Sequence, residues 1–330
     1  MAEEVVLMKG NEAIAHAAIR CGADGYFGYP ITPQSEVLET LAELKPWETT
    51  GMVVLQAESE VAAINMVYGG AGSGKMVLTS SSSPGVSLKQ EGISSICAAE
   101  LPCLIVNVMR GGPGIGSIQA GQGDYYQSVK GGGHGDYQVL VFAPSSVQEA
   151  IDCIGKAFDL ADKYRMPAMI CADGIIAQMM EPVELPEMKE YHVDPAKKPW
   201  AATGYDPKNP VGERADITSL YVETEELDVL HERLQATYAK VRENEVQYEA
   251  YNMDNAEIVV TAFGTVARIA KSVIDELEAE GIHVGMLRPI TLWPFPYDAI
   301  HDAAVKSGVK AVLDIEMNAG QMLDDVKVAI

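Results

Sequence analysis

Two carboxylates at the start of a predicted helix are the first residues in this sequence that could do chemistry. Glu58 and Glu60 precede a nearly continuous apolar run, and this pattern predicts a helix over 58–66. The helix dipole stabilises a carboxylate at a helix N-terminus, so helix-end charge is a sufficient explanation for Glu58. The apolar run after Glu60 predicts that its side chain is buried. Burial would favour the protonated carboxyl and allow it to share a proton with a ligand nitrogen.

A proline-rich turn is the second candidate. Residues 28–35 read Gly-Tyr-Pro-Ile-Thr-Pro-Gln-Ser, between an apolar pair and a periodic apolar stretch. The prolines fix the backbone and push the preceding residues toward extended geometry. The pattern predicts a rigid strand-to-helix turn in which Thr32 and Ser35 either cap the helix or touch a ligand. A proline-stiffened helix start without a ligand is the structural alternative.

A glycine-rich segment is the third candidate. Arg110 ends an apolar strand pattern over 103–109, and the residues from there to Asp136 show no periodicity. An irregular stretch of this length in a compact domain is usually functional, and a surface insertion is the alternative.

Two glycine motifs point to nucleotides only superficially. Residues 69–75 resemble a P-loop, but Met76 stands where a Ser or Thr would hold Mg²⁺. The predicted order there is helix, loop, strand, so the loop amides do not lie at a helix N-terminus. Residues 112–116 follow a strand, but no helix pattern follows them, as a dinucleotide site would require.

The elements that must position these residues alternate along the chain. In the N-terminal unit, residues 1–182, the predicted strands span 5–8, 52–55, 76–79, 103–109, 139–142 and 168–171. The predicted helices span 10–22, 58–66, 86–99 and 146–161, and a further helix runs from the proline turn to about residue 44. Apolar strands joined by helices predict a parallel sheet that is covered on both faces.

A connector and a second α/β unit follow. Residues 183–252 are first rich in proline and charge and then predict a charged helix over 223–248. The unit 253–330 has predicted strands at 258–262, 283–287 and 311–315, and helices at 265–279, at 296–305 and from about 318. The chain stops inside that last helix pattern, so we expect a short further C-terminal piece.

Charge and composition exclude several classes of partner. The 330 residues carry a formal net charge of −23, which disfavours nucleic acids and anionic membranes. No basic N-terminal region precedes an apolar stretch, and no apolar run approaches the roughly 18 residues of a membrane span. The five cysteines show no ligand spacing. We therefore expect a cytoplasmic chain with reduced thiols that holds neither a metal nor an iron–sulfur cluster.

The order and spacing of several motifs carry a resemblance over nearly the whole chain. They are Tyr29–Pro33, Ser59-Glu60, residues 79–90 (TSSSSPGVSLKQ), Arg110–Pro113 and His134–Asp136. In this order they resemble the α subunit of 2-oxoacid:ferredoxin oxidoreductases, closest to the type acting on 3-methyl-2-oxobutanoate (2-ketoisovalerate). Phe263–Thr265, Arg288-Pro289, Pro294–Pro296 and Glu316–Gln321 resemble a transketolase C-terminal-like domain. The resemblance implies a thiamine diphosphate pyrimidine-binding domain followed by that C-terminal domain.

The resemblance also implies roles for individual residues. Glu60 matches the glutamate that hydrogen-bonds N1′ of the cofactor's aminopyrimidine and controls its tautomer. Thr32 matches a threonine near the thiazolium and the substrate, with Pro30 and Ile31 in the same cofactor-binding turn. Arg110 matches the arginine that binds the 2-oxoacid carboxylate, a task that suits a bidentate guanidinium, and an ordinary ion pair is its alternative.

Two further residues are weaker matches. His134 and Asp136 are expected near the substrate, and hydrogen bonds that merely order their loop are the alternative.

Half of such a site is missing from the sequence. Gly123-Asp124-Tyr125 and Gly135-Asp136-Tyr137 are not the Gly-Asp-Gly-type motif that holds Mg²⁺ and the diphosphate. The resemblance therefore implies a β subunit carrying that motif, together with γ and ferredoxin-like subunits. Iron–sulfur clusters would lie on the β subunit or on the ferredoxin-like one, and this chain alone would be inactive.

The implied reaction is oxidative decarboxylation of a 2-oxoacid. CO₂ leaves, coenzyme A takes the acyl group as co-substrate, and electrons pass to ferredoxin. One alternative is the β subunit of a lipoamide-linked 2-oxoacid dehydrogenase, and another is a scaffold subunit that has kept the fold without the site.

Overall fold

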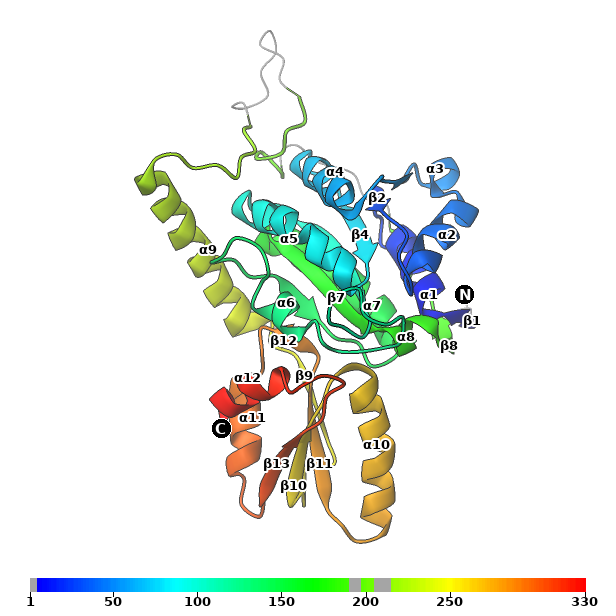
Figure 1. Cartoon of the computed structure of the whole chain (residues 1–330), viewed down its shortest axis with the longest axis vertical. Helices are drawn as coiled ribbons and strands as arrows, with labels where there is room; N and C mark the ends of the chain where they lie inside the picture. Colours follow the sequence, from blue (N-terminus) through cyan, green and yellow to red (C-terminus); the bar gives the residue numbers. More distant parts are fainter. Residues whose placement is uncertain (1–4, 190–196, 205–214) are drawn as a thin grey trace.

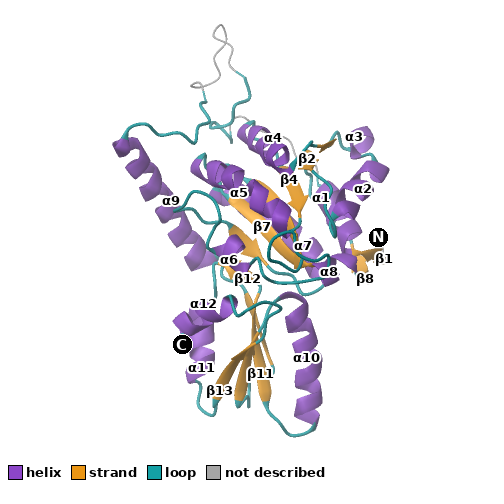
Figure 2. Ribbon diagram, in the orientation of Figure 1, coloured by secondary structure: helices purple, strands orange, loops and turns teal. Residues whose placement is uncertain are grey.

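The chain forms two α/β units that follow one another along the long axis of the molecule (Figure 1). The structure is a computed structural model that describes residues 5–189, 197–204 and 215–330. A seven-stranded sheet forms the first unit and a four-stranded sheet the second, and a two-stranded sheet lies beside the first (Figure 2).

The seven-stranded sheet carries the candidate site. Its strands are β2 (Gly25–Gly28), β3 (Val53–Gln56), β4 (Val77–Ser81), β5 (Cys103–Met109), β6 (Leu140–Phe142), β7 (Pro167–Asp173) and β12 (Thr291–Trp293). Across the sheet the order is β12-β6-β7-β5-β4-β2-β3, and every neighbouring pair is parallel except β12 with β6. All residues of β5 and β7 are buried, because both faces of the sheet centre are covered. The predicted doubly covered parallel sheet is confirmed.

Helices connect and cover these strands. They are α1 (Gly10–Arg20), α2 (Ser35–Leu44), α3 (Pro46–Thr49), α4 (Glu60–Gly72), α5 (Ser83–Ala98), α6 (Tyr125–Val129), α7 (Val147–Tyr164) and α8 (Gly174–Gln178). Helix α5 lies over the sheet with α4 beside it (Figure 2). The two helices approach closely at Gly92, where a Cβ atom would lie 2.5 Å from Cγ2 of Ile64. As predicted, residues 69–75 end a helix and precede a strand, an order that a P-loop does not have.

The first predicted strand does not belong to the parallel sheet. Strand β1 (Val5–Lys9) pairs antiparallel with β8 (Met180–Glu184), which the sequence did not predict. Val5 and Leu7 are 58% and 62% exposed, so β1 buries only one face. A short apolar run is compatible with either kind of strand, and the prediction of a parallel position for residues 5–8 was wrong.

The predicted connector is partly structured. Its residues 190–196 and 205–214 lie outside the described residues. The charged helix, α9, spans Thr224–Asn244 and packs through Leu230, Leu234 and Tyr238. Strand β9 (Tyr248–Tyr251) follows where the sequence predicted the end of that helix, and it pairs with the second sheet.

The second unit follows its predicted order. Its sheet has the order β13-β10-β11-β9, with β10 (Ile258–Thr261) parallel to β11 (Val284–Pro289) and β13 (Ala311–Asp314). The helices are α10 (Gly264–Ala279), α11 (Tyr297–Val305) and α12 (Met322–Ala329), so the last begins later than predicted. The unpredicted strand β12 crosses to the first sheet and joins the two units.

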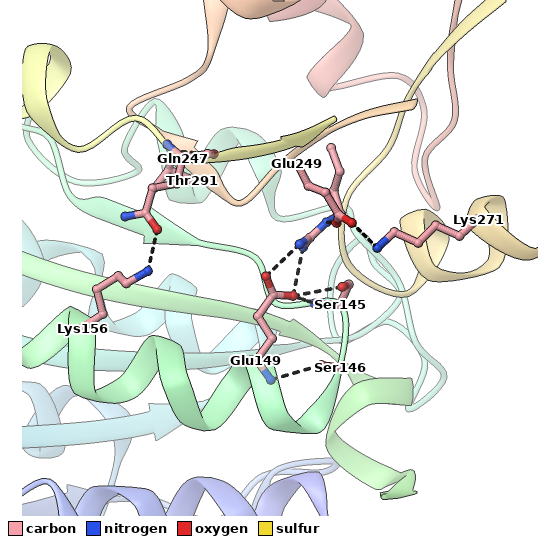
Figure 3. A network of polar contacts seen from close by, with 9 residues as sticks. Ser145, Ser146, Glu149, Lys156, Gln247, Glu249, Lys271 and Thr291 are labelled. Atoms are coloured by element: carbon pink, nitrogen blue, oxygen red, sulfur yellow. Dashed lines mark hydrogen bonds and ion pairs between the residues drawn. The ribbon is translucent and has the colours of Figure 1, made fainter. Parts of the chain in front are cut away.

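Arg288 forms a second link between the units, through Glu149 and Glu249, which are labelled in Figure 3. Its guanidinium is nearly buried and donates to both carboxylate oxygens of Glu149 in α7, at 3.0 and 2.8 Å. Its Nε donates to Glu249 at 2.8 Å, and Glu249 also accepts from Lys271. A bidentate pair of this kind fixes both distance and orientation.

Replacing Glu149 tests this link. Glu149→Gln should lower the free energy of unfolding by about 2 kcal/mol, because it removes charge-assisted hydrogen bonds to a nearly buried guanidinium. Urea titration of the full chain measures the change. Glu243→Gln, at an exposed position of α9, is the matched control. Equal losses in the two variants would contradict a specific role for Glu149.

Candidate active site

The proline turn is held in place from several sides. Gln34 is fully buried, and its amide nitrogen donates to the Tyr29 carbonyl at 3.0 Å while its oxygen accepts from Ser80 of β4 at 2.5 Å. The Pro33 carbonyl accepts from the side-chain amide of Asn11 at 2.7 Å. The predicted rigidity of the turn therefore comes from its side-chain contacts as well as from the prolines.

Thr32 lies at the exposed tip of this turn. Pro30 and Ile31 before it are partly buried. The predicted capping by Thr32 or Ser35 is not seen, because Gln34 occupies the N-cap position of α2 and makes no side-chain cap hydrogen bond. The second predicted use of Thr32, contact with a ligand, stays a prediction.

Arg110 connects the turn to the glycine-rich segment. Its side chain is buried at the end of β5, with one terminal nitrogen donating to the Thr32 carbonyl at 2.8 Å and the other to the Ile115 carbonyl at 2.6 Å. Its Nε is buried without a partner in the described part of the chain. Arg110 and Thr32 are thus brought together, and part of the guanidinium's hydrogen-bonding capacity is already used on the backbone.

The glycine-rich segment folds back on the end of β5. The amide of Gly111 donates to the Gln119 carbonyl at 2.8 Å, and that of Ser117 donates to the Gly111 carbonyl at 2.7 Å. Ile115 and Ile118 at its tip are 82% and 62% exposed. The segment is therefore an ordered loop that presents apolar side chains next to Arg110.

A polar cluster behind Arg110 was not predicted from the sequence. Asp124 accepts from Ser83 Oγ at 2.5 Å and from Asn107 Nδ2 at 2.9 Å, and the Arg110 amide donates to Ser83 Oγ at 3.0 Å. Burial raises the pKa of Asp124. Asn107, a polar residue inside an otherwise apolar strand, was the available signal.

Glu60 lies at the first position of α4. The Ser59 hydroxyl accepts from the Ala62 amide at 3.2 Å and caps the helix. The structure buries Glu60, which is 6% exposed, and leaves Glu58 exposed, as the apolar run predicted. No hydrogen bond reaches the Glu60 carboxylate from any residue in the described ranges, and its oxygens are not among the side-chain atoms that are buried without a partner.

The neighbours of this carboxylate leave it open to a ligand. A Cβ atom on Gly85 of α5 would lie 2.8 Å from Glu60 Oε1 and 2.1 Å from Ser81 Oγ, so only glycine fits there. The hydroxyls of Ser81 and Ser82 are buried without partners among the described residues. An acceptor and two hydroxyls that lack partners fit the polar edge of a heterocycle.

Lys89 is a further site residue that sequence reasoning missed. It is fully buried in α5, and its ammonium donates to Thr79 Oγ1 at 3.2 Å and to the backbone carbonyl of Glu60 at 3.4 Å. Burial lowers the pKa of Lys89 to about 8, and the charge of Glu60 opposes that change. The signal was its place on the apolar stripe of Val86 and Ile93.

His134 and Asp136 lie in a loop that contacts α5 at Ser94. Both are exposed, and the His134 carbonyl accepts from Ser94 Oγ at 2.5 Å. Tyr137 and Gln90 hold the same loop through a hydrogen bond of 3.1 Å. Ser94 follows Gly85 by nine positions, about 14 Å along the helix, so the His134 end of this loop contacts α5 away from Glu60.

The second unit contacts the end of the glycine-rich loop. Gln122 is fully buried, its backbone amide donates to the Met317 carbonyl at 3.0 Å, and its side-chain oxygen accepts from the Met317 amide at 3.0 Å. Its side-chain nitrogen donates to the Phe263 carbonyl at 2.9 Å. Nearby, Asp173 accepts from the amide and the hydroxyl of Thr265 at 2.8 and 2.6 Å.

The cysteines and possible metal ligands contribute nothing to this site. Burial raises the pKa values of Cys103, Cys153 and Cys171 to about 12, so these thiols are poor nucleophiles. Within the described ranges, no group of three or more His, Cys, Asp and Glu side chains is arranged to hold a metal. None of the described helices is long and apolar enough to cross a bilayer.

Known families match both units of the chain. Residues 16–250 match the family described as "Pyruvate flavodoxin/ferredoxin oxidoreductase, thiamine diP-bdg". Residues 256–330 match "Pyruvate:ferredoxin oxidoreductase core domain II". The chain belongs to the 2-oxoacid:ferredoxin oxidoreductase family.

Relatives in this family cover nearly the whole chain. Ketoisovalerate oxidoreductase subunit VorB of Methanothermobacter thermautotrophicus is 49% identical over 98% of this chain and 89% of its own length. 2-Oxoglutarate synthase subunit KorA of Methanocaldococcus jannaschii is 37% identical over 98% of this chain and 91% of its own. The predicted family is confirmed, and so is the predicted type of enzyme, an oxidoreductase. This result argues against the alternative of a lipoamide-linked dehydrogenase subunit.

Solved structures agree on the fold. The 2-oxoglutarate:ferredoxin oxidoreductase from Magnetococcus marinus superposes with a TM-score of 0.86 at 26% identity over 99% of this chain, which spans 60% of that longer chain. A split-gene transketolase gives a TM-score of 0.55 at 12% identity, which shows the fold alone. The predicted fold class is confirmed. The Glu60 carboxylate, which accepts no hydrogen bond from the described residues, and the glycine beside it fit the family's thiamine diphosphate.

The buried lysine gives a pH-dependent prediction. The fall in the pKa of Lys89 from 10.5 to about 8 means that the unfolded chain binds more protons between these pH values. The wild-type chain should therefore gain about 3 kcal/mol of stability relative to Lys89→Met as the pH rises from 8 to 10.5. Urea titrations at several pH values measure this, with the exposed Lys240→Met as control. Parallel stability curves for the wild type and Lys89→Met would contradict it.

Proposed function

We propose that this chain supplies the pyrimidine-side half of a thiamine diphosphate site, in an oxidoreductase that converts a branched-chain 2-oxoacid to its acyl-CoA and CO₂ and reduces ferredoxin. The carrying observation is Glu60, a buried residue whose carboxylate accepts no hydrogen bond from the described part of the chain and lies against Gly85. Such a carboxylate is free to accept a hydrogen bond from a bound ligand.

Each predicted site residue has a task in this proposal. Glu60 holds a proton between its carboxylate and a ring nitrogen of the cofactor. Pro30 and Ile31 form the wall of the turn that faces the cofactor, and the exposed Thr32 orients the reacting end of the substrate. Arg110, with N–H groups left over from its backbone contacts, binds the 2-oxoacid carboxylate. Thiamine diphosphate, when bound, supplies the carbanion stabilisation that decarboxylation needs.

Partner subunits complete the site. Exposed apolar side chains surround the candidate site: Val61 is 47% exposed, Leu88 is 55% exposed and Ile115 is 82% exposed. An apolar rim of this kind suits a protein interface, and we assign it to a β subunit that holds Mg²⁺ and the diphosphate. The complex also contains γ and ferredoxin-like subunits, its iron–sulfur clusters lie on the β or the ferredoxin-like subunit, and it is cytoplasmic. Coenzyme A is the co-substrate, as in the Magnetococcus marinus enzyme, which was solved with coenzyme A and succinyl-CoA bound.

The preference for a branched-chain substrate rests on the relatives. The identity to the ketoisovalerate subunit is 49%, against 37% to the 2-oxoglutarate subunit and 29% to the pyruvate synthase subunit PorA of Methanocaldococcus jannaschii. Residues around Thr32 and Arg110 are expected to share the substrate pocket with the β subunit.

Glu60→Gln tests the proposed function. In the complex purified anaerobically with its partners, the variant should lose about 100-fold or more of the ferredoxin-reducing activity, because a glutamine amide neither takes up nor releases a proton. Glu58→Gln is the matched control, since Glu58 lies two residues away and is exposed. Full activity of Glu60→Gln would remove this residue from the mechanism and favour the scaffold alternative.

Substrate choice is a separate prediction. The kcat/KM of the complex should be highest with 3-methyl-2-oxobutanoate and about tenfold or more lower with 2-oxoglutarate and pyruvate. A difference of this size is expected when a substrate leaves one or two methylenes mismatched or a charge unpaired in the pocket. Steady-state assays with ferredoxin as acceptor measure this ratio. A higher value for 2-oxoglutarate would refute the branched-chain assignment and leave the family unchanged.

A further inference from the structure

A buried carboxylate of the second unit holds the short helix α6 at both of its ends. Asp325, in α12, is 3% exposed. It accepts from the Tyr125 hydroxyl at the start of α6 at 2.7 Å, and from the Lys130 ammonium just after the end of α6 at 2.6 Å. The Tyr297 hydroxyl of α11 donates to the same carboxylate at 2.5 Å. Three donors on one carboxylate fix its position between the two units.

The start of α12 makes further contacts with the same segment. The side chain of Gln321 donates to the Gly123 carbonyl at 2.9 Å and accepts from the Tyr126 amide at 3.0 Å. The Tyr126 hydroxyl donates to Asp324. Gln321 is partly buried and Asp324 is exposed, whereas Asp325 is buried. Because water screens a buried charge-assisted hydrogen bond less than an exposed one, Asp325 is the main link between α12 and α6.

Packing alone does not account for a carboxylate at this position. Met322 and Val326 on the same helix are buried and apolar. An apolar side chain at position 325 would bury the same face without the cost of desolvating a charge. What the carboxylate adds is direction, because two oxygens that accept from fixed donors set the orientation of α6 as well as its distance.

Helix α6 carries this orientation to Arg110. Asp124, directly before Tyr125 in the sequence, accepts from Ser83 Oγ at 2.5 Å. Ser83 Oγ in turn accepts from the Arg110 amide at 3.0 Å. Asp325 is therefore connected to the backbone of Arg110 through three hydrogen bonds and one peptide bond.

We propose that Asp325 is a positioning residue that holds Arg110 in place for the carboxylate of the substrate. The inference rests on the proposed function, in which Arg110 binds the 2-oxoacid. Glu60 on α4 takes no part in the hydrogen bonds that connect Asp325 to Arg110. Loss of the Asp325 charge should therefore weaken binding of the 2-oxoacid and leave binding of thiamine diphosphate unchanged.

The test compares the wild-type complex with Asp325→Asn, which keeps the size of the side chain and removes its charge. In steady-state assays with 3-methyl-2-oxobutanoate and ferredoxin, the KM should rise about tenfold because the guanidinium is displaced, while kcat should stay within about twofold. Calorimetry should give the same affinity for thiamine diphosphate in both complexes. An unchanged KM, or equal losses of affinity for substrate and cofactor, would overturn the inference.

Hydrogen–deuterium exchange of the same complexes gives a readout that does not depend on activity. The amides of Gly111 and Ser117 are hydrogen-bonded within the glycine-rich loop. Their exchange should be about threefold or more faster in Asp325→Asn, because the loop opens more often once α6 is released. Exchange in β10 and β11 should not change. Loop amides that exchange at the wild-type rate would also overturn the inference.

Matched variants separate this role from a general loss of structure. Asp302→Asn removes an exposed carboxylate of α11, in the same unit, and should leave the KM and the loop exchange unchanged. Should Asp325→Asn fail to assemble, Tyr125→Phe serves instead, because it keeps the buried ring beside Phe263 and removes the hydroxyl that binds Asp325. Tyr125→Phe should raise the KM about threefold, the effect of one hydrogen bond. A wild-type KM in Tyr125→Phe would contradict the role of Asp325.

The outcomes also distinguish this inference from the proposed function. If the wild-type complex neither binds thiamine diphosphate nor converts a 2-oxoacid, or if Arg110→Met leaves the KM unchanged, the proposed function or its role for Arg110 fails, and the inference fails with it. If Arg110→Met raises the KM and Asp325→Asn leaves it at the wild-type value, only the role of Asp325 is refuted.

Discussion

The burial of one carboxylate organises the candidate site. A residue that is 6% exposed loses most of its contact with water, and a carboxylate in that position needs favourable electrostatic partners. The N-terminus of α4 contributes a favourable dipole, and Lys89 contributes a positive charge from α5. The contact with Lys89 requires α4 and α5 to lie close together, and Gly85 and Gly92 permit that approach, since a Cβ atom at either would overlap α4. The packing of these two helices is thus inseparable from the chemistry of the site.

The remaining site residues are held by contacts to the backbone. Arg110 binds the carbonyls of Thr32 and Ile115, and Gln34 binds the carbonyl of Tyr29. These segments follow the carboxyl ends of β2 and β5, the edge at which open parallel sheets bind ligands. Backbone acceptors are fixed by the fold, so the turn and the loop keep their relative positions without a ligand. The protein's own contacts therefore set the geometry of the site before the cofactor binds.

Patterns along the sequence predicted what depends on local periodicity. The parallel sheet and the burial of Glu60 both followed from apolar runs. Contacts between distant segments could not be found in this way. Lys89 is charged but sits on an apolar stripe, and only its packing against Glu60 and Thr79 explains it. The pairing of β1 with β8 likewise brings together residues about 175 positions apart in the sequence, and neither segment contains a pattern that predicts its partner strand.

The contacts of the second unit explain why its motifs accompany the site. Two of the motifs that carried the resemblance, 263–265 and 316–321, are the segments that meet Asp173 and Gln122. Gln122 lies two residues before Asp124, which holds Ser83, and Ser83 in turn holds the backbone of Arg110. A displacement of the second unit would therefore act on Arg110 through a short chain of hydrogen bonds. Because β12 and Arg288 resist such a displacement, the second unit serves as the support that keeps the glycine-rich loop, and with it the substrate side of the site, in place.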